Sequence, residues 1–163
     1  MGRQNKVKQV DLAYIAGFLD GDGSVIFQIK KRKDTSRGKR FMFTICFYQD
    51  TRHEKPLFWI KKILNDGYLS QRNDGITELR IDGYKRVQEI LQKLNPYLKF
   101  KKKQVGFILV VINILRKRSM SNLSEGDKKV IINSLIQVRK ESYQSGKKKK
   151  DKLKKDLEFI EKL

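Results

Sequence analysis

The stretch GFLDGDGSVI, residues 17–26, decides how the chain begins to fold. It closes an apolar run, sets Asp20 and Asp22 among glycines, and then passes into alternating residues. The glycines after Asp20 predict the end of a helix over 12–19, for which Asp11 is the expected N-cap. The alternation that follows predicts a strand over 24–32. The sequence therefore places two carboxylates where a helix runs into a strand.

These carboxylates stand out because the chain is strongly basic. Lys and Arg number 38 against 18 Asp and Glu, a formal net charge of +20 over 163 residues. Ten basic and five acidic side chains lie in 139–163, so most of the excess lies on the rest of the chain. A folded body with this charge indicates a polyanionic partner, most often nucleic acid, although solubility is an alternative reason for surface lysines.

The composition also excludes several classes of protein. A single cysteine, Cys46, allows no internal disulfide and no cysteine-cluster metal site, which indicates a reducing compartment. No apolar stretch approaches the length of a membrane span, and the N-terminal residues lack the apolar region of a secretory signal. We therefore expect no membrane partner and no secretion.

The remaining patterns predict an α+β domain. Further helices are expected over 54–65, 84–94, 101–115 and 123–143, and further strands over 40–49, 67–72 and 76–82. The order is α-β-β-α-β-β-α followed by extra helices, and strands with one apolar face pack their helices on that face. We expect one domain over 1–143 and a Lys-rich segment over 144–163, either a docked amphipathic helix or a tail.

The opposite face of the predicted sheet carries hydrogen-bonding and cationic side chains. Such side chains on a twisted ribbon suit reading of the DNA major groove, although an ordinary solvated sheet face is the alternative. The candidate DNA-binding residues are Ser24, Gln28, Lys30, Arg32, Arg40, Thr44, Tyr48, Ser70, Arg72, Glu78 and Arg80. This set contains a single acid, which favours DNA.

Small residues recur every four positions along the first helix. Ala13, Gly17 and Gly21 form a stripe that lets two helix backbones approach closely, and the simplest partner is the same helix of a second copy. We expect a homodimer interface made by Ala13, Ala16, Gly17, Asp20 and Gly21. Two copies of Asp22 would then meet at the axis, where a divalent cation relieves their repulsion and supports phosphodiester hydrolysis.

The same residues resemble a known family. LAYIAGFLDGDG, residues 12–23, is similar to the signature of the LAGLIDADG homing endonucleases, and NPYLKFKKKQ, residues 95–104, resembles a segment of their single-motif, homodimeric, intron-encoded branch. The resemblance covers roughly the first 115 residues. It implies an antiparallel, saddle-shaped sheet with helices on one face, plus C-terminal helices.

The resemblance also implies roles for matching positions. Asp22 would ligate Mg²⁺ or Mn²⁺, with the backbone carbonyl of Gly21 as a second ligand. Gln49 would organise solvent, which explains a polar residue at the apolar parity of its strand. Lys101 would polarise the water network or stabilise charge on the reacting phosphate. Asp20 is expected to support the helix end rather than to bind metal.

A basic residue is also expected shortly after Gln49, and Arg52 or His53 can fill this place. His53 is the only histidine, so nucleases built on several histidines are excluded.

The function implied is a site-specific homing endonuclease. It would act as a homodimer and make a staggered double-strand break in a long, pseudo-palindromic DNA target. Two alternatives on the same fold are an intron RNA maturase, with intron RNA as a partner, and a DNA-binding regulator that does not cleave. The Lys-, Ile- and Asn-rich composition favours an organelle, a mitochondrion or chloroplast, or otherwise a prokaryotic cytoplasm.

Overall fold

The computed structural model describes residues 7–34, 37–141 and 147–163. The predicted order of elements is confirmed: α1 (Gln9–Asp22), β1 (Gly23–Lys31), β2 (Lys39–Asp50), the short 3-10 helix η1 (Thr51–His53), α2 (Lys55–Leu64), β3 (Tyr68–Gln71), β4 (Ile76–Asp82) and α3 (Tyr84–Leu94), then α4 (Lys102–Lys117), η2 (Met120–Asn122), α5 (Glu125–Lys140) and α6 (Lys147–Glu161). No helix among the described residues is long and apolar enough to cross a membrane.

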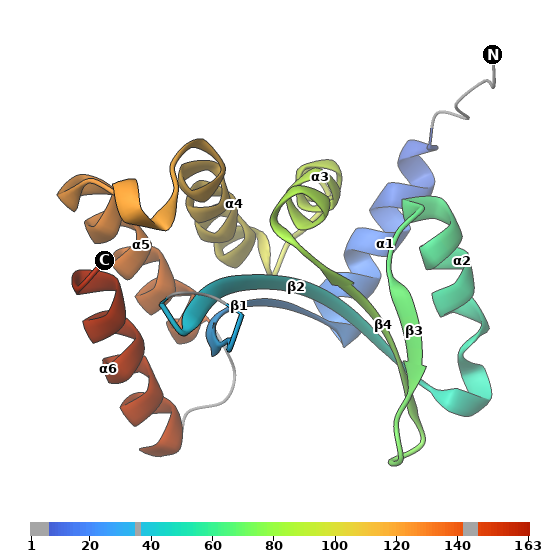
Figure 1. Cartoon of the computed structure of the whole chain (residues 1–163). Helices are drawn as coiled ribbons and strands as arrows, with labels where there is room; N and C mark the ends of the chain where they lie inside the picture. Colours follow the sequence, from blue (N-terminus) through green and yellow to red (C-terminus); the bar gives the residue numbers. More distant parts are fainter. Residues whose placement is uncertain (1–6, 35–36, 142–146) are drawn as a thin grey trace. The chain divides into compact units, whose positions relative to one another are not determined.

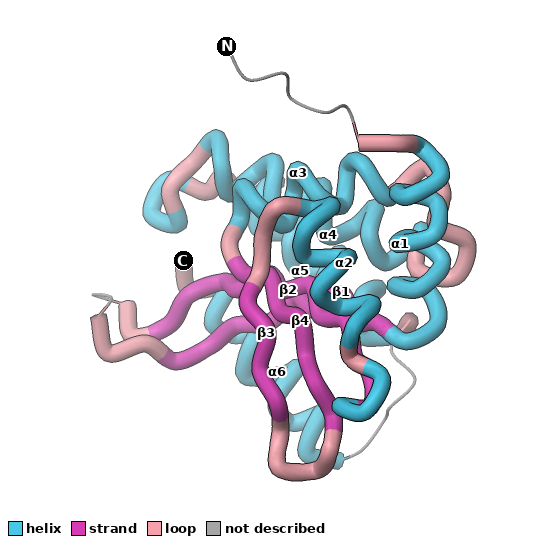
Figure 2. Tube along the Cα trace, turned by 90° about the vertical axis from the view of Figure 1, so that its right-hand side faces the viewer, coloured by secondary structure: helices cyan, strands magenta, loops and turns pink. Residues whose placement is uncertain are grey.

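The four strands form one sheet in the order β1-β2-β4-β3. Strand β4 pairs antiparallel with β2 on one side and with β3 on the other. Figure 2 shows β3 and β4 as neighbouring strands joined by their turn. In β4 the residues Thr77, Leu79 and Ile81 are buried, while Glu78 and Arg80 between them are only half-buried, as a strand with two different faces requires.

Helix α1 is longer at both ends than the sequence predicts. It begins at Gln9, so Asp11 lies in the first turn rather than at the cap, where its negative charge still favours the helix. It runs through Gly21 to Asp22 before β1 begins. A Cβ atom at Gly23 would lie 2.6 Å from Leu19 Cδ1 and 2.9 Å from Leu19 Cα, so this close approach of helix and strand requires glycine.

The chain divides into two compact units, of which the first comprises Met1–Ile26 and Thr44–Lys102. In this unit α1, α2 and α3 lie on one side of β3 and β4 (Figure 1). Its core consists of fully buried apolar side chains from these helices and from β2 and β4: Ile15, Leu19, Ile45, Phe47, Leu57, Ile60, Leu79, Ile81, Val87 and Leu91.

The second unit comprises Phe27–Phe43 and Lys103–Leu163. The Phe27 ring stacks on the Phe43 ring at a centroid distance of 4.8 Å, and Phe41 contacts Phe159 of α6. Asp156 of α6 accepts a hydrogen bond from Arg139 of α5 at 3.2 Å, and Ile160 is fully buried. Helix α6 is therefore docked against its own unit.

The predicted division between residues 143 and 144 lies outside the described residues. Residues 147–163 belong to the same compact unit as α4 and α5.

Candidate active site

The two aspartates at the end of α1 have different surroundings. Asp20 is 9% exposed, and its carboxylate accepts hydrogen bonds from the backbone N–H groups of Lys99 at 2.7 Å, Phe100 at 3.2 Å and Lys101 at 2.9 Å. Asp22 is exposed. The expected structural role of Asp20 is confirmed, because its carboxylate holds the turn before α4 against the end of α1. The exposed carboxylate of Asp22 is not taken up in this turn, and its catalytic role stays a prediction.

Lys101 is fixed at the same helix end. Its Nζ donates a hydrogen bond to the backbone oxygen of Asp20 at 2.7 Å. Burial lowers the pKa of Lys101 below its usual value, and the charges of Asp20 and Asp22 oppose that shift. The structure thus holds the Lys101 ammonium group at the end of α1, two residues before Asp22, although Lys101 is far from this helix in the sequence.

Gln49 lies near the end of β2, opposite Thr77 of β4. It is half-buried, as its parity on the strand predicts, and its Oε1 accepts a hydrogen bond from the Asp50 backbone N–H at 2.9 Å. This bond orients the side chain and leaves the amide NH₂ as a donor to water or phosphate. Its role in catalysis stays a prediction.

Of the two basic residues after Gln49, Arg52 is already paired. Its Nε and Nη2 donate to the two carboxylate oxygens of Asp50 at 3.0 and 2.7 Å. The hydrogen bonds from Arg52 lower the pKa of Asp50 well below its usual range. His53 is exposed, at the end of η1. Arg52 is thus bound to Asp50 whereas His53 is exposed, and which of the two serves the site stays a prediction.

The end of α1 offers oxygen donors that fit a hard divalent cation. Asp22 supplies an exposed carboxylate, and Gly21 lies in the last turn, where a helix carbonyl has no amide partner four residues on. Among the described residues no group of three His, Cys, Asp or Glu side chains is placed to hold a metal ion. Among the described residues, Asp22 is therefore the exposed carboxylate at this helix end, and its role as a metal ligand stays a prediction.

The small-residue stripe of α1 is only partly available to a second copy. Ala13, Gly17 and Gly21 are exposed, and a Cβ atom added at either glycine meets nothing within 4 Å. Ala16, fully buried, and Asp20 lie within the unit, which corrects their assignment to an interface. The error arises because a four-residue period does not identify which neighbouring stripe faces the core.

The polar sheet face in the first unit forms ordered rows across β2, β4 and β3. Cys46, Arg80 and Tyr68 form one row, and the next is Tyr48, Glu78 and Ser70. Burial raises the pKa of Cys46 to about 11 and that of Tyr48 to about 12, so both keep their protons at neutral pH. The exposed side chain of Tyr68 was not predicted for this face, although its parity with Ser70 could have identified it.

Thr44 and Arg80 are less available than predicted. Thr44 is fully buried and its hydroxyl donates to Asp82, so it does not reach a partner directly. Arg80 is held between Glu78 at 3.3 Å and Asp82 at 3.0 Å, with 18% of its side chain exposed. Asp82 is a second acid on this face, and its alternation with Glu78 and Arg80 could have revealed it.

The other candidate DNA-binding residues fall in three local settings. Ser24 and Gln28 are half-buried, whereas Lys30, Arg40 and Ser70 are exposed. Two arginines form exposed ion pairs with a nearby aspartate: Arg32 with Asp34 and Arg72 with Asp74, each at 2.7 Å. Of the eleven candidates, Gln28, Lys30, Arg32 and Arg40 belong to the second unit. Basic side chains on a strand face, together with a carboxylate and a lysine at one helix end, are typical of proteins that act on nucleic acid.

Comparison with known proteins agrees with this class. The family described as "LAGLIDADG endonuclease" matches residues 15–114. The chain is 36% identical over 107 residues to the DNA endonuclease I-CvuI of Chlorella vulgaris, covering 66% of each chain. It is 31% identical to the DNA endonuclease I-CreI of Chlamydomonas reinhardtii, covering 64% of this chain and 63% of that relative. Both alignments span just under two thirds of the relative.

Solved structures match over more of the chain. A crystal structure of I-CvuI with the I-CreI target, in 2 mM Mg and with the DNA not cleaved, matches at a TM-score of 0.73 and 28% identity, covering 94% of this chain and 96% of that one. The structure of the archaeal intron-encoded homing endonuclease I-Vdi141I with DNA matches at a TM-score of 0.74 and 22% identity, again covering 94% of this chain and 96% of that one. This match shows that the two proteins share a fold. The chain belongs to the LAGLIDADG endonuclease family, and the predicted family and fold class are confirmed.

Proposed function

We propose that two copies of the chain bind a long, pseudo-palindromic DNA duplex and cut both strands by metal-dependent hydrolysis. The observation that carries this proposal is that the two aspartates at the end of α1 have different surroundings. The Asp20 carboxylate accepts three backbone hydrogen bonds, whereas Asp22 is exposed. The Lys101 ammonium group is bonded to the Asp20 backbone oxygen, two residues before Asp22. A carboxylate and a half-buried ammonium group at one helix end suit phosphodiester chemistry.

A dimer is proposed because one chain supplies too few ligands for a divalent cation. A single Asp22 carboxylate is insufficient to hold a divalent cation firmly, because such ions take six or more oxygen ligands. The exposed stripe of Ala13, Gly17 and Gly21 lets a second α1 approach and brings a second Asp22 to the axis. Equivalent strand faces on the two copies would then read the two halves of the target, which makes the target pseudo-palindromic.

The chain's own residues have separate tasks. Asp22 and the Gly21 carbonyl would hold Mg²⁺ or Mn²⁺, which when bound makes water more acidic and stabilises charge on the departing oxygen. Lys101 places a positive charge near the reacting phosphate. Gln49, oriented by its bond to Asp50, donates from its amide to the attacking water or to a phosphate oxygen. The water attacks phosphorus, and the bond to the 3′ oxygen or the 5′ oxygen at the cut breaks as that oxygen takes up a proton.

Relatives support the proposal through what their names and titles state. I-CvuI and I-CreI are named DNA endonucleases, and I-CvuI has been crystallised on DNA with Mg and with Ca. We carry over a duplex DNA substrate and a divalent cation on this basis. An organelle or a prokaryotic cytoplasm remains the proposed location.

The test is cleavage of a randomised duplex library in Mg²⁺, with Asp22→Asn and, as a control on the same helix, Asp11→Asn. We expect discrete double-strand cuts at one long site with the wild type and Asp11→Asn. Asp22→Asn should bind the selected site and leave it intact. Binding without cutting by all three proteins would reject the endonuclease and favour the regulator, and cutting by Asp22→Asn would reject the role of this carboxylate.

A further inference from the structure

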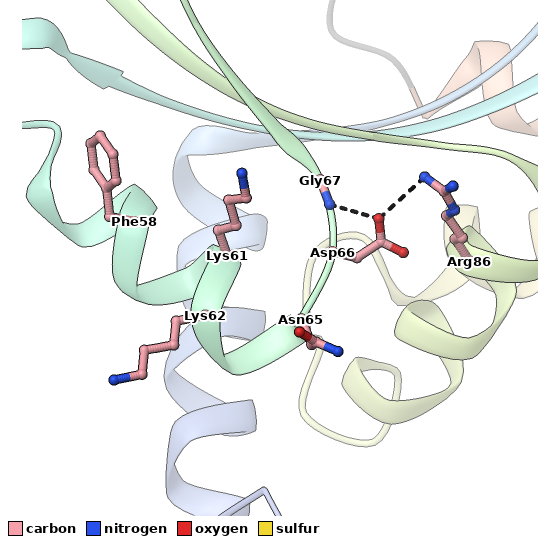
Figure 3. A pocket seen from close by; sticks show the side chains of 7 residues that line it. All are labelled: Phe58, Lys61, Lys62, Asn65, Asp66, Gly67 and Arg86. Atoms are coloured by element: carbon pink, nitrogen blue, oxygen red, sulfur yellow. Dashed lines mark hydrogen bonds and ion pairs between the residues drawn. The ribbon is translucent and has the colours of Figure 1, made fainter.

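A second polar site lies between α2 and α3 in the first unit. It is an open pocket of about 640 Å³ lined by side chains of α2, of the turn into β3 and of α3. Figure 3 shows Lys61, Asn65, Asp66 and Arg86 around it, with Phe58 one turn earlier on α2. None of the lining residues belongs to the proposed DNA face or to the catalytic site.

Phe58 provides an exposed aromatic surface beside the pocket. Its side chain is 53% exposed, although it is on a helix that buries Leu57 and Ile60 completely. An exposed aromatic ring flanked by cations is the arrangement on which an unpaired base stacks, because every base offers an apolar face to a ring.

Cations line the pocket from two elements. Lys61 and Lys62 are exposed in the last turn of α2, and Arg86 reaches in from the first turn of α3 with 64% of its side chain exposed. Three cations within one pocket attract a phosphate group, and the planar guanidinium of Arg86 can bind it through two N–H donors.

The pocket also contains an acid, Asp66, which can distinguish ribonucleotides from deoxyribonucleotides. Asp66 Oδ1 accepts from the Gly67 backbone N–H at 2.6 Å and from Arg86 at 3.4 Å, as Figure 3 shows. Both bonds use Oδ1, which leaves Oδ2 to accept from a further donor. A carboxylate repels phosphate but accepts from hydroxyl groups, and ribose supplies a 2′-hydroxyl that deoxyribose lacks.

From this juxtaposition we propose that the pocket binds an unpaired ribonucleotide of an RNA strand. The base stacks on Phe58, the phosphate lies between Lys61 and Arg86, and the 2′-hydroxyl donates to Asp66. Lys62 points away from these two cations in Figure 3 and adds positive charge on the outer side of α2. This inference goes beyond cleavage of DNA and does not depend on it.

A strand fits the site better than a free nucleotide does. All the lining residues are exposed or half-exposed, so the pocket cannot enclose a small ligand as tight small-molecule sites do. Exposed lysines continue beyond the pocket on the same two helices, Lys55 on α2 and Lys85 on α3, where they can contact neighbouring phosphates. Binding therefore depends on several nucleotides at once and falls with salt.

The test is fluorescence anisotropy with a labelled, unstructured 12-nucleotide RNA and its DNA counterpart, in excess unlabelled duplex DNA that occupies the sheet face. Three pocket variants are compared: Phe58→Leu, the pair Lys61→Gln with Lys62→Gln, and Asp66→Asn. The pair Lys117→Gln with Lys129→Gln makes the same charge change at exposed positions on α4 and α5. Thermal unfolding of each variant checks that it is folded, and duplex cleavage is measured in parallel.

We expect Phe58→Leu and the Lys61/Lys62 pair to weaken RNA binding about tenfold, because stacking and phosphate contacts are lost. Cleavage of duplex DNA by these variants should stay within about twofold of the wild type. Asp66→Asn should weaken RNA more than single-stranded DNA and so reduce the preference for RNA. These outcomes would support the site whether or not the wild type cuts DNA.

Other outcomes would overturn the proposal. RNA binding that falls no more in the pocket variants than in the Lys117/Lys129 pair would place RNA elsewhere on the chain. Equal affinity of the wild type for RNA and single-stranded DNA would reject recognition of the ribose. Adenosine monophosphate that competes as well as the 12-mer would replace the strand by a free ribonucleotide.

Discussion

The side chains of Asp20 and Lys101 each form a hydrogen bond with the other residue's backbone. The Asp20 carboxylate accepts from the Lys101 backbone N–H at 2.9 Å, and Lys101 Nζ donates to the Asp20 backbone oxygen at 2.7 Å. The residues are 81 positions apart in the sequence. Their reciprocal bonds set the position of the Lys101 ammonium group relative to the end of α1, and hence to Asp22.

Replacing Asp20 should therefore affect stability and activity together. Asp20→Asn keeps one acceptor oxygen but loses the charge that strengthens three backbone hydrogen bonds. We expect the free energy of unfolding to fall by roughly 2 kcal/mol and cleavage to slow because Lys101 is displaced. Urea unfolding at fixed protein concentration and single-turnover cleavage measure the two effects.

Asp22→Asn is the matched comparison, because Asp22 is exposed and its removal should abolish cleavage with little change in the urea midpoint. If Asp20→Asn unfolds at the wild-type urea concentration, the hydrogen bonds of its carboxylate do not stabilise the fold.

A second prediction concerns the exposed stripe of α1. Gly17→Leu meets no atom within 4 Å of its Cβ inside one chain, but it would hold two α1 helices apart. We expect a folded protein that sediments as a monomer and does not cut DNA. Analytical ultracentrifugation and circular dichroism measure assembly and fold.

Gly106→Ala, on α4, is the control for adding a side chain to an open helical glycine, and it should remain a dimer. A Gly17→Leu protein that is dimeric and active would show that the subunits associate through another surface.

Cys46 should be unreactive in the folded protein. Burial raises its pKa to about 11, whereas the reactive species is the thiolate. At pH 8 we expect alkylation by iodoacetamide to be at least about a hundredfold slower than for an ordinary exposed thiol. Mass spectrometry of native and urea-unfolded protein gives the two rates. Equal rates in the two states would contradict the buried, protonated thiol.

The ion pair between Arg139 and Asp156 predicts that the stability lost on replacing Arg139 depends on pH. Burial raises the pKa of Asp156 above its ordinary 3.8, so the folded state binds this proton more tightly than the unfolded state does. In acid the carboxyl is protonated, and burying it does not reduce the free energy of unfolding through its charge. As the pH rises above 3.8 and through the raised pKa of the folded state, the carboxyl ionises and its burial destabilises the fold. Arg139→Met removes the hydrogen bond to this buried carboxylate, which keeps only the charges of Lys152 and Lys39 nearby, and should cost roughly 2 kcal/mol at pH 7.

We expect this difference between Arg139→Met and wild type to shrink on acidification toward the ordinary pKa of the carboxyl. The double variant Arg139→Met with Asp156→Asn lacks the titrating group, and its difference from wild type should not change with pH. Thermal unfolding from pH 4 to 8 measures all three proteins. A pH-independent loss in Arg139→Met would show that Arg139 acts through packing alone.

Much of the fold could be read from local sequence patterns. Helix α3 has the predicted ends, Tyr84 and Leu94, because Gly83 precedes it and Pro96 follows it. The alternation in β2 identifies Phe41, Phe43, Ile45 and Phe47 as core residues. The same alternation fails for Thr44, because parity gives the face of a side chain but not the neighbour, here Asp82, that covers it.

The candidate site was also predicted only in part, because sequence patterns do not identify the tertiary neighbours of a side chain. Sequence patterns and resemblance locate Asp22 at the junction of helix and strand, since a helix end, a glycine and a strand start are local features. They do not show that Ala16 is buried or that Arg52 is paired with Asp50, because these depend on which surfaces meet.

The sequence by itself thus determined the order of elements, the basic character and the family. Tertiary structure decided the sheet order β1-β2-β4-β3, the docking of α6 and the separate roles of the two aspartates. The physical reason is that periodicity and charge are properties of short segments. The burial of Asp20 and the exposure of Asp22 depend instead on residues 99–101, which only folding brings to the end of α1.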